Sequence, residues 1–323
     1  MTMGVRIHET GGPEVLRWEG IEVGRPGVGE VRLAQSAVGL NFIDVYHRSG
    51  LYKLALPAVI GSEAAGVVEE VGAGVTGFKV GDRVSYAGVT GAYAQARLIA
   101  ADRLVPLPGD IRDDAAAAAM LKGMTAQYLL RRTCRVEPGD MVLIHAAAGG
   151  VGLIACQWAK HLGATVIGTV STDEKATLAR SHGCDHPIVT RREDFVARVK
   201  EITGGRGVRV VYDSVGKDTW EGSLDCIRPL GMMVSYGNSS GPVPSFSPLV
   251  LSAKGSLFLT RPTLMAYTAR REDLMASAGE LFDVIRRGVV RVEINRTYPL
   301  AEAARAHRDL EERRTTGSSV LRP

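Results

Sequence analysis

One stretch, residues 141–162, constrains the fold more than any other, because it reads as a buried strand, a glycine-rich turn and a helix in direct succession. The strand is the apolar run from Met141 to Ile144, preceded by the turn-forming sequence Pro138-Gly139-Asp140. The turn is AAAGGVG (146–152), and the residues after it are apolar at helical spacing. Such a unit predicts a parallel sheet whose strands are connected by helices.

The turn meets the physical requirements of a dinucleotide-binding fingerprint, although Ala147 replaces the first glycine of the usual pattern. Gly149 and Gly150 allow the backbone to approach a pyrophosphate, and Gly152 allows the helix to pack closely on the strand. The N–H groups at the start of the helix are donors for phosphate oxygens. We therefore predict that a dinucleotide binds at residues 149–152, Val151 included; a purely structural turn is the alternative.

Composition sets looser limits. A chain of 323 residues has room for about two domains. The net charge is +4, but the basic residues are dispersed or occur as pairs near acidic residues, so nucleic acid is not an expected partner. The first residues contain no apolar signal region, and no apolar run is long enough to span a membrane. Four widely spaced cysteines favour neither a disulfide framework nor a zinc lobe. We expect a cytoplasmic protein.

The order of the patterns predicts two domains of an α/β protein. Residues 1–118 read as short strands separated by turns, which is typical of a β-rich, barrel-like domain. Residues 119–256 alternate strands and helices in the doubly wound pattern. The tail, 257–323, contains two helical patterns and a final strand. We expect the tail to complete the first domain, and the ligand to bind between the two domains.

Three segments carry a resemblance to a known family: GSEAAGVVEEVGAGVTGFKVGDRV (61–84), AAAGGVG (146–152) and TTGSSVL (315–321). They resemble the zinc-independent quinone oxidoreductase branch of the medium-chain dehydrogenase/reductase superfamily. The stretch 208–241 is similar to bacterial NADPH:quinone oxidoreductases, whose eye-lens relative is zeta-crystallin. The resemblance covers the whole chain. It implies a GroES-like catalytic domain, a Rossmann domain that binds NADPH, and a homodimer joined near Leu249 to Leu259.

Two positions in the sequence indicate whether this chain binds a catalytic zinc ion. Zinc-dependent members of the superfamily hold the catalytic ion with an early cysteine and with the histidine of a G-H-E motif. Here Asn41 stands in place of the cysteine and Ser62 in place of the histidine. Neither is a usual zinc ligand, and a lone histidine such as His47 is more readily a structural residue. We therefore predict no metal, which disfavours an alcohol dehydrogenase.

The end of the second strand of the dinucleotide domain favours NADPH over NADH. An acidic residue there would bind the ribose hydroxyls of NAD, but Val170 stands at the comparable place. Ser171 and Lys175 offer a hydroxyl and a cation to a 2′-phosphate. The alternative is that Lys175 is an ordinary exposed helix residue, and we take Asp173 to be the N-cap of that helix.

One departure from the family lies on the next strand. The quinone reductases usually have a tyrosine or histidine near the adenosine at the position of Thr190. Arg191 beside it could serve as a phosphate partner instead.

The resemblance implies further positions in the site. Asn41 and Tyr46 would lie at the nicotinamide end, and Thr125 would help to hold the nicotinamide or ribose. The remaining cofactor contacts that it implies are Gly216, Gly237, Asn238, Ser239, Ser240, Phe258, Leu259, Thr260 and Gly317. For each of them, turn chemistry or core packing is the alternative explanation.

The predicted reaction is direct hydride transfer from NADPH to a quinone, with no zinc and little need for acid catalysis. Asn41 and Tyr46 are the candidate polar groups facing the acceptor, and Tyr52 is a further candidate. No sequence pattern identifies a proton donor. Two alternatives stay open: reduction of the double bond of an enone or enoyl thioester, and an NADPH-regulated RNA-binding or structural protein.

Overall fold

The structure is a computed structural model that describes residues 2–323. Its contacts divide the chain into two compact units. Unit 1 takes the chain up to Met124, together with Tyr267–Arg286 and Val292–Pro323, and unit 2 takes Thr125–Ala266 and Arg287–Arg291. Each unit has its own sheet system and its own hydrophobic core.

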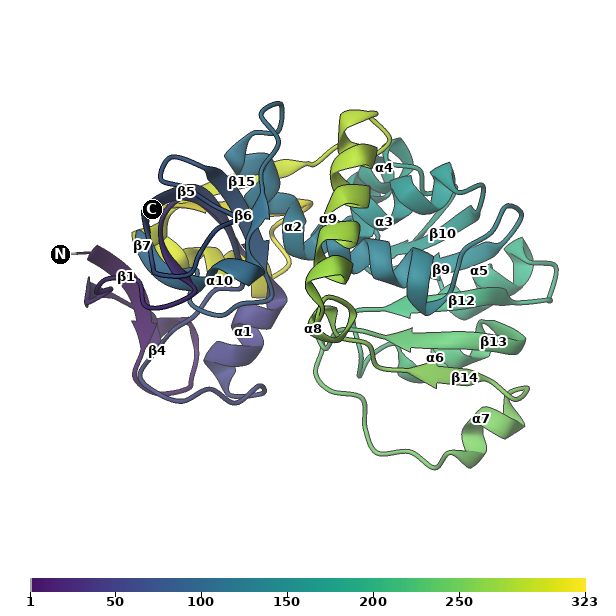
Figure 1. Ribbon diagram of the computed structural model, residues 1–323. Coiled ribbons are helices and arrows are strands. Elements are labelled where there is room, and N and C mark those ends of the chain that lie inside the picture. The colour runs from purple at the N-terminus through teal and green to yellow at the C-terminus, as the bar shows by residue number, and fades with distance from the viewer. Residues whose placement is uncertain (1) are drawn as a thin grey trace. The chain divides into compact units, whose positions relative to one another are not determined.

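Unit 1 is built mainly from antiparallel strands. Its larger sheet has the order β15-β16-β3-β5-β6-β8, with β7 also paired to β3, and a smaller sheet has the order β2-β1-β4. Figure 1 shows the C-terminal strands, in yellow, among the N-terminal strands, because β16 pairs with β3. The strands are β1 (Thr2–Ile7), β2 (Arg17–Ile21), β3 (Glu30–Gly39), β4 (Ala58–Val59), β5 (Glu63–Val71), β6 (Arg83–Ala87), β7 (Ala96–Ala100), β8 (Val105–Pro106), β15 (Ile294–Pro299) and β16 (Ser318–Arg322).

Alternation along the strands explains the core of unit 1. In β3, Val31, Leu33, Gln35 and Ala37 are buried and the residues between them are half-buried, as a strand with one face on the core requires. The longer helices of this part of the chain are α1 (Phe42–Ser49), α2 (Asp113–Tyr128), α9 (Arg271–Arg286) and α10 (Ala303–Glu311), with short 3₁₀ turns at Pro13–Val15, Ala101–Arg103 and Leu300–Glu302.

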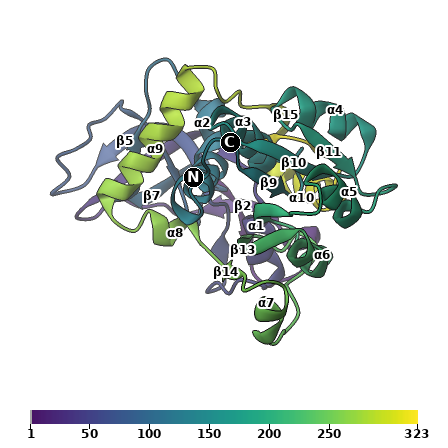
Figure 2. The same cartoon turned by 90° about the vertical axis from the view of Figure 1, so that its right-hand side faces the viewer.

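Unit 2 is a doubly wound domain with a six-stranded, fully parallel sheet in the order β11-β10-β9-β12-β13-β14. Figures 1 and 2 both show β9 and β10 side by side with α3 next to them. The strands are β9 (Met141–Ile144), β10 (Thr165–Val170), β11 (His186–Val189), β12 (Val208–Asp213), β13 (Ile227–Ser235) and β14 (Phe258–Thr260). The helices are α3 (Gly150–His161), α4 (Asp173–Ser181), α5 (Phe195–Ile202), α6 (Trp220–Asp225), α7 (Leu249–Ala253) and α8 (Leu264–Tyr267), and a π-helical turn covers Leu129–Thr133. The predicted α/β class with a doubly wound sheet is confirmed.

One boundary differs from the expectation. We placed the return to the first domain at residue 257, but β14 hydrogen-bonds in parallel with β13, and the contact division falls after Ala266. Hydrogen bonding between strands decides this boundary, and it is not visible in local composition.

Candidate functional site

The candidate site in unit 1 is built on the first turn of α1. Asn41 is the N-cap of this helix and is 6% exposed. Its side-chain Nδ2 donates to Oε1 of Glu63 at 2.9 Å. Glu63 is fully buried at the start of β5 and also accepts the Leu121 N–H (2.6 Å) and the Lys122 ammonium (2.5 Å). Asn41 is thus part of a buried polar cluster with an ion pair that we did not predict.

A second buried carboxyl group, Asp44, also contacts Asn41. It accepts the backbone N–H of Asn41 (3.0 Å), the Ser62 hydroxyl (2.7 Å) and the Tyr93 hydroxyl (3.1 Å). Asp44 forms no ion pair within residues 2–323. Burial raises the pKa of Asp44 to about 7, although its three donors oppose the shift. The carboxyl group therefore changes its charge near neutral pH.

The network continues from Tyr93 to the C-terminal helix α10. The Tyr93 hydroxyl lies 2.9 Å from Nε2 of His307, and Nδ1 of His307 lies 3.2 Å from Nη1 of Arg48. Arg48 also donates two hydrogen bonds of 2.8 Å to Glu311. Because a guanidinium only donates, Nδ1 of His307 accepts and Nε2 carries the hydrogen. Burial, assisted by Arg48, lowers the pKa of His307 to about 3, so the ring is neutral.

The two predicted tyrosines contact each other. Tyr46 is buried on α1, Tyr52 follows the helix, and their rings meet edge to face with centroids 5.2 Å apart. The Tyr52 N–H donates to the Tyr46 carbonyl at 3.0 Å, which holds the loop after α1 against the helix. The two rings therefore lie in a fixed arrangement beside α1, the helix whose N-cap is Asn41.

At the positions that hold zinc in zinc-dependent relatives, this chain has two side chains that donate hydrogen bonds. Asn41 donates to Glu63, and Ser62 donates to Asp44. Within residues 2–323 no group of three His, Cys, Asp or Glu side chains is placed to hold a metal ion. An amide N–H and a hydroxyl turned toward carboxylates are not a zinc donor set.

In unit 2, the glycine-rich turn joins β9 to α3. Gly149 is the N-cap of α3, so the N–H groups of the first helical turn have no intrahelical partner. A Cβ on Gly152 would lie 2.3 Å from the Ala146 carbonyl oxygen and 2.8 Å from the Cα of Ala147. Only glycine allows this approach of helix to turn. The unpaired N–H groups and the bare backbone fit a pyrophosphate.

A second group of predicted residues lies at the carboxyl ends of β10 and β11. The Thr190 N–H and hydroxyl both bond the Val170 carbonyl (2.9 and 3.2 Å), which brings Thr190 and Arg191 next to Ser171. The Thr190 hydroxyl therefore donates its hydrogen to the protein backbone. The Arg191 side chain is exposed and forms no ion pair within residues 2–323. A cation without a protein partner at this edge fits a phosphate group.

The start of α4 corrects one expectation. Thr172, and not Asp173, is the N-cap, because its Oγ1 accepts the Lys175 N–H at 3.3 Å. Asp173 is the first helical residue, and its carboxylate pairs with Arg192 at 2.5 Å. Lys175 lies in the first turn of α4, one turn after Ser171. Threonine and aspartate are both good N-caps, so the sequence alone does not rank them.

The loops after β12 and β13 lie against each other. Asp213 at the end of β12 is fully buried and accepts the N–H groups of Val215 (2.7 Å) and Gly216 (3.0 Å). Gly216 has a left-handed backbone with φ 91°, which favours glycine. A Cβ on Gly237 would lie 2.4 Å from the Ser214 carbonyl oxygen.

Serines and an asparagine complete this contact. The N–H groups of Ser239 and Ser240 donate to the carbonyls of Ser214 (3.2 Å) and Val215 (2.9 Å). The Ser240 hydroxyl donates to the Val215 carbonyl as well, at 2.9 Å. The Asn238 amide, oriented with its oxygen toward Arg261, lies 2.9 Å from that guanidinium. These two serines therefore have a structural role in the loop.

A buried histidine that we did not predict connects the two turns of unit 2. His145, directly before the glycine-rich turn, contacts Thr169 Oγ1 through Nδ1 and Ser223 Oγ through Nε2, both at 2.9 Å. Ser223 donates to Asp213 at 3.2 Å, and Thr169 Oγ1 accepts the Ala146 N–H at 3.3 Å. Burial lowers the pKa of His145. The turn after β9 and the turn after β12 are thus fixed to one internal chain of hydrogen bonds.

The remaining predicted residues are dispersed. Thr125 is buried on α2, and Gly317 precedes β16 with φ 57°. A Cβ on Gly317 would lie 2.7 Å from the Glu293 carbonyl oxygen, so packing within unit 1 already requires glycine there. Phe258, Leu259 and Thr260 form β14 at the edge of the sheet, where Phe258 is 58% exposed.

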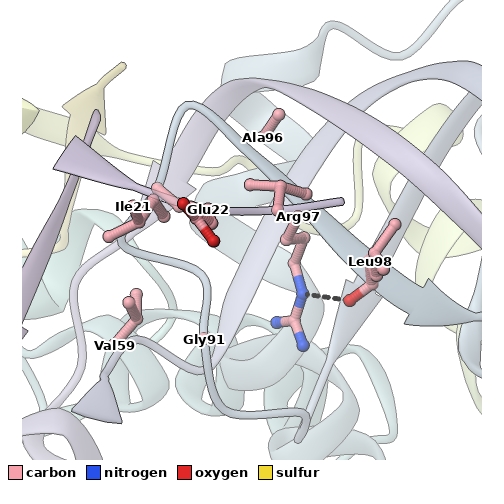
Figure 3. A pocket seen from close by; sticks show the side chains of 9 residues that line it. Ile21, Glu22, Val59, Gly91, Ala96, Arg97 and Leu98 are labelled. Atoms are coloured by element: carbon pink, nitrogen blue, oxygen red, sulfur yellow. Dashed lines mark hydrogen bonds between the residues drawn. The ribbon is translucent and has the colours of Figure 1, made fainter. Parts of the chain in front are cut away.

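A hollow of about 210 Å³ lies in unit 1 between β2, β4 and β7. Figure 3 shows the side chains that line it. Arg97 projects there, but its Nε bonds the Leu98 carbonyl and its Nη1 bonds Tyr86 and Val89, each at 3.2 Å. The hollow is smaller than a typical ligand pocket and contains none of the predicted site residues. It is therefore not part of the candidate site.

The buried polar residues that we did not predict differ in how clearly the sequence marks them. Asp44 is three residues after the N-cap Asn41, a spacing that allows a capping box, and Glu63 directly follows Ser62. Lys122, Tyr93, His145 and His307 have no local pattern that marks them, because their partners come from distant parts of the chain.

Comparison with known proteins agrees with this geometry. Residues 27–109 match the family model described as alcohol dehydrogenase GroES-like domain, and residues 150–279 match the model described as zinc-binding dehydrogenase. The predicted GroES-like domain and the superfamily are therefore confirmed.

Individual relatives match over their whole length. The chain is 55% identical to a quinone oxidoreductase of Pseudomonas aeruginosa, with all of both chains covered. It is 52% identical to a 2-haloacrylate reductase of a Burkholderia species, covering 100% of this chain and 99% of the relative. The crystal structure of Escherichia coli quinone oxidoreductase complexed with NADPH superimposes with a TM-score of 0.98 at 51% identity, covering 99% of this chain and all of the other.

Proposed function

Because this chain belongs to the quinone oxidoreductase family of the medium-chain dehydrogenase/reductase superfamily, we propose that it reduces quinones with NADPH and without zinc. The observation that carries the proposal is the edge of the unit 2 sheet. There the glycine-rich turn, the Ser171–Lys175 segment and the unpaired Arg191 follow neighbouring parallel strands. Ligands of doubly wound sheets bind at this edge.

Each part of the site has a distinct task in the proposed reaction. The backbone of residues 149–152 would hold the pyrophosphate, and Ser171, Lys175 and Arg191 would hold the 2′-phosphate. When bound, NADPH supplies the hydride. Asn41, Tyr46 and Tyr52 would orient the acceptor and exclude water, since all three are buried or half-buried around α1. A reduced quinone takes its protons from water, so no dedicated acid is required.

A second candidate function has its own support. The 2-haloacrylate reductase among the relatives is named for a substrate with an activated carbon–carbon double bond. Reduction of such a bond leaves a carbanion that must be protonated. Asp44 titrates near neutral pH and receives the Ser62 hydroxyl, so unit 1 contains a group suited to hold a proton.

The test is oxidation of NADPH and of NADH by the purified protein with quinones and enones, before and after treatment with a chelator. We expect turnover of quinones with NADPH, unaffected by the chelator. Turnover of enones alone would support the second candidate, and loss of activity on chelation would contradict the zinc-free proposal.

The proposed 2′-phosphate site can be tested by substituting Arg191 and, as a control, the adjacent Arg192. Arg191→Ala should raise the KM for NADPH about tenfold or more, because a charge-assisted hydrogen bond is lost, and should leave the KM for NADH unchanged. Arg192→Ala is the matched control, since Arg192 is already paired with Asp173. Equal effects of the two variants on NADPH would contradict the assignment.

We further propose a cytoplasmic homodimer. All four cysteines are buried and unpaired, as in a reducing compartment. Within residues 2–323, no helix is long and apolar enough to cross a membrane. The dimer contact would use the β14 edge, where Leu249 is 77% and Phe258 58% exposed.

A further inference from the structure

The side-chain amide of Asn41 is held in one of its two orientations by an acceptor that cannot donate. Nδ2 of Asn41 lies 2.9 Å from Oε1 of Glu63. The same carboxylate receives the Leu121 N–H on Oε2 and the Lys122 ammonium on Oε1. A carboxylate that faces an ammonium and a backbone N–H is ionised and can only accept hydrogen bonds, so a third group beside it must be a donor.

The opposite orientation of the amide is unfavourable at both ends. It would place the amide oxygen of Asn41 against the Glu63 carboxylate. It would also turn the NH₂ group toward the backbone N–H of Asp44, which faces the Asn41 side chain in the capping box at the start of α1 and donates to the Asn41 carbonyl at 3.1 Å. One hydrogen of the NH₂ group points to Glu63, and the second has no acceptor within residues 2–323. Asn41 therefore offers an N–H donor.

The cluster leaves no room for rearrangement. Glu63 is fully buried, and Lys122 is 5% exposed. A Cβ on Gly39 would lie 2.2 Å from both Oε1 of Glu63 and the Ala117 carbonyl oxygen, so backbone packs directly on the carboxylate. Two of the donors to Glu63 come from α2 and the third from the N-cap of α1. Rigid elements thus determine where the Glu63 carboxylate lies, and the carboxylate determines the orientation of the Asn41 amide.

We propose that Glu63 and Lys122 are positioning residues that fix Asn41 as the hydrogen-bond donor to the acceptor's carbonyl oxygen. The inference deepens the proposed function and rests on it, since Asn41 is there the group that faces the acceptor. Hydride from NADPH forms the new bond to the acceptor, the nicotinamide is oxidised, and the carbonyl electron pair moves onto the oxygen. The oxyanion later takes a proton from water. A donor already oriented toward that oxygen stabilises the developing charge.

The decisive variant removes both charges of the pair. Glu63→Gln alone would leave the Lys122 ammonium buried without a partner and could prevent folding. The double variant Glu63→Gln/Lys122→Met keeps the charge balance but gives Asn41 a neighbour that both donates and accepts. We expect kcat/KM for quinones to fall about tenfold or more, since losing one oxyanion donor costs that order or above. The KM for NADPH should not change.

A quinone series separates positioning from general damage. The loss should grow as the quinone becomes less electron-poor, because a weaker acceptor depends more on stabilisation of its oxyanion. Asn41→Asp, which removes the donor itself, should lose at least as much. Glu70→Gln is the matched control: it lies on the same strand, β5, is half-buried and forms no ion pair within residues 2–323. It should behave as the wild type does.

Binding of a substituted phenol, followed by its absorbance, provides a readout independent of turnover. The wild type should bind the phenolate more tightly than the neutral phenol, and the double variant should lose this preference. A folded double variant with wild-type kcat/KM and wild-type phenolate preference overturns the inference. A loss of equal size for every quinone, accompanied by weaker NADPH binding, also overturns it. If the wild type reduces no quinone but prefers the phenolate, the proposed function fails while the positioning of Asn41 stands.

Discussion

At the scale of single residues, two buried titratable groups change stability with pH in opposite directions. Asp44 has a raised pKa of about 7, so its stabilising contribution is complete below its unfolded value of 3.8 and is lost as the pH rises through about 7. His307 has a lowered pKa of about 3 against 6.5 when unfolded, so its contribution is present above 6.5 and is lost as the pH falls toward 3. The two effects partly cancel between pH 4 and 7.

Asp44→Asn should reveal the increase of stability with pH that His307 contributes and that Asp44 partly cancels in the wild type. The variant has no carboxyl group to ionise, so its free energy of unfolding relative to the wild type should increase from pH 4 to pH 8 by about 4 kcal/mol. Urea unfolding at several pH values measures this. Asp218→Asn, an exposed substitution in unit 2, is the control and should show no pH-dependent difference. Parallel pH profiles for Asp44→Asn and the wild type would contradict the assigned pKa.

At the scale of elements, the beginning of α3 depends on a glycine that packing requires. Gly152→Ala would force a Cβ to within 2.3 Å of the Ala146 carbonyl oxygen, so α3 must move away from the turn. We expect a loss of about 1–3 kcal/mol in the free energy of unfolding, together with weaker NADPH binding. Thermal unfolding and a titration with NADPH measure the two effects.

A glycine in another helix provides the control for this prediction. Gly279 lies inside α9, and a Cβ there meets no atom within 4 Å. Gly279→Ala should therefore stabilise the protein by about 1 kcal/mol, because alanine has the higher helix propensity. If both variants lose stability equally, close packing of α3 is not the cause.

At the scale of the whole molecule, the open edge of the unit 2 sheet predicts the assembly. β14 ends the strand order, and Leu230, Leu249 and Phe258 are exposed near it. Apolar side chains beside an unpaired strand favour association with a second copy. Leu249→Lys should shift the proposed dimer toward monomer in sedimentation equilibrium. Val80→Lys, at a residue of unit 1 that is 63% exposed, should not. A monomeric wild type would exclude this interface.

The sequence by itself determined the local units of the dinucleotide domain. The buried strand at 141–144 was predicted with the bounds that the structure has, and the glycine-rich turn after it was predicted in its place, although α3 already begins at Gly150. Each is decided by residues adjacent in the chain: apolar runs fit buried parallel strands, and glycine fits a turn that a Cβ would block. The α/β class follows, because alternating strands and helices have few ways to bury their apolar faces.

Only the tertiary structure decided the polar interior of the site. Asn41 was predicted, but Glu63, Lys122, Asp44 and His307 come from β5, α2, α1 and α10, and only folding brings them together. The same holds for β14, which joins the unit 2 sheet through its bonds to β13. Burying a charge is favourable only with a partner, and a single sequence does not record which distant residue provides that partner.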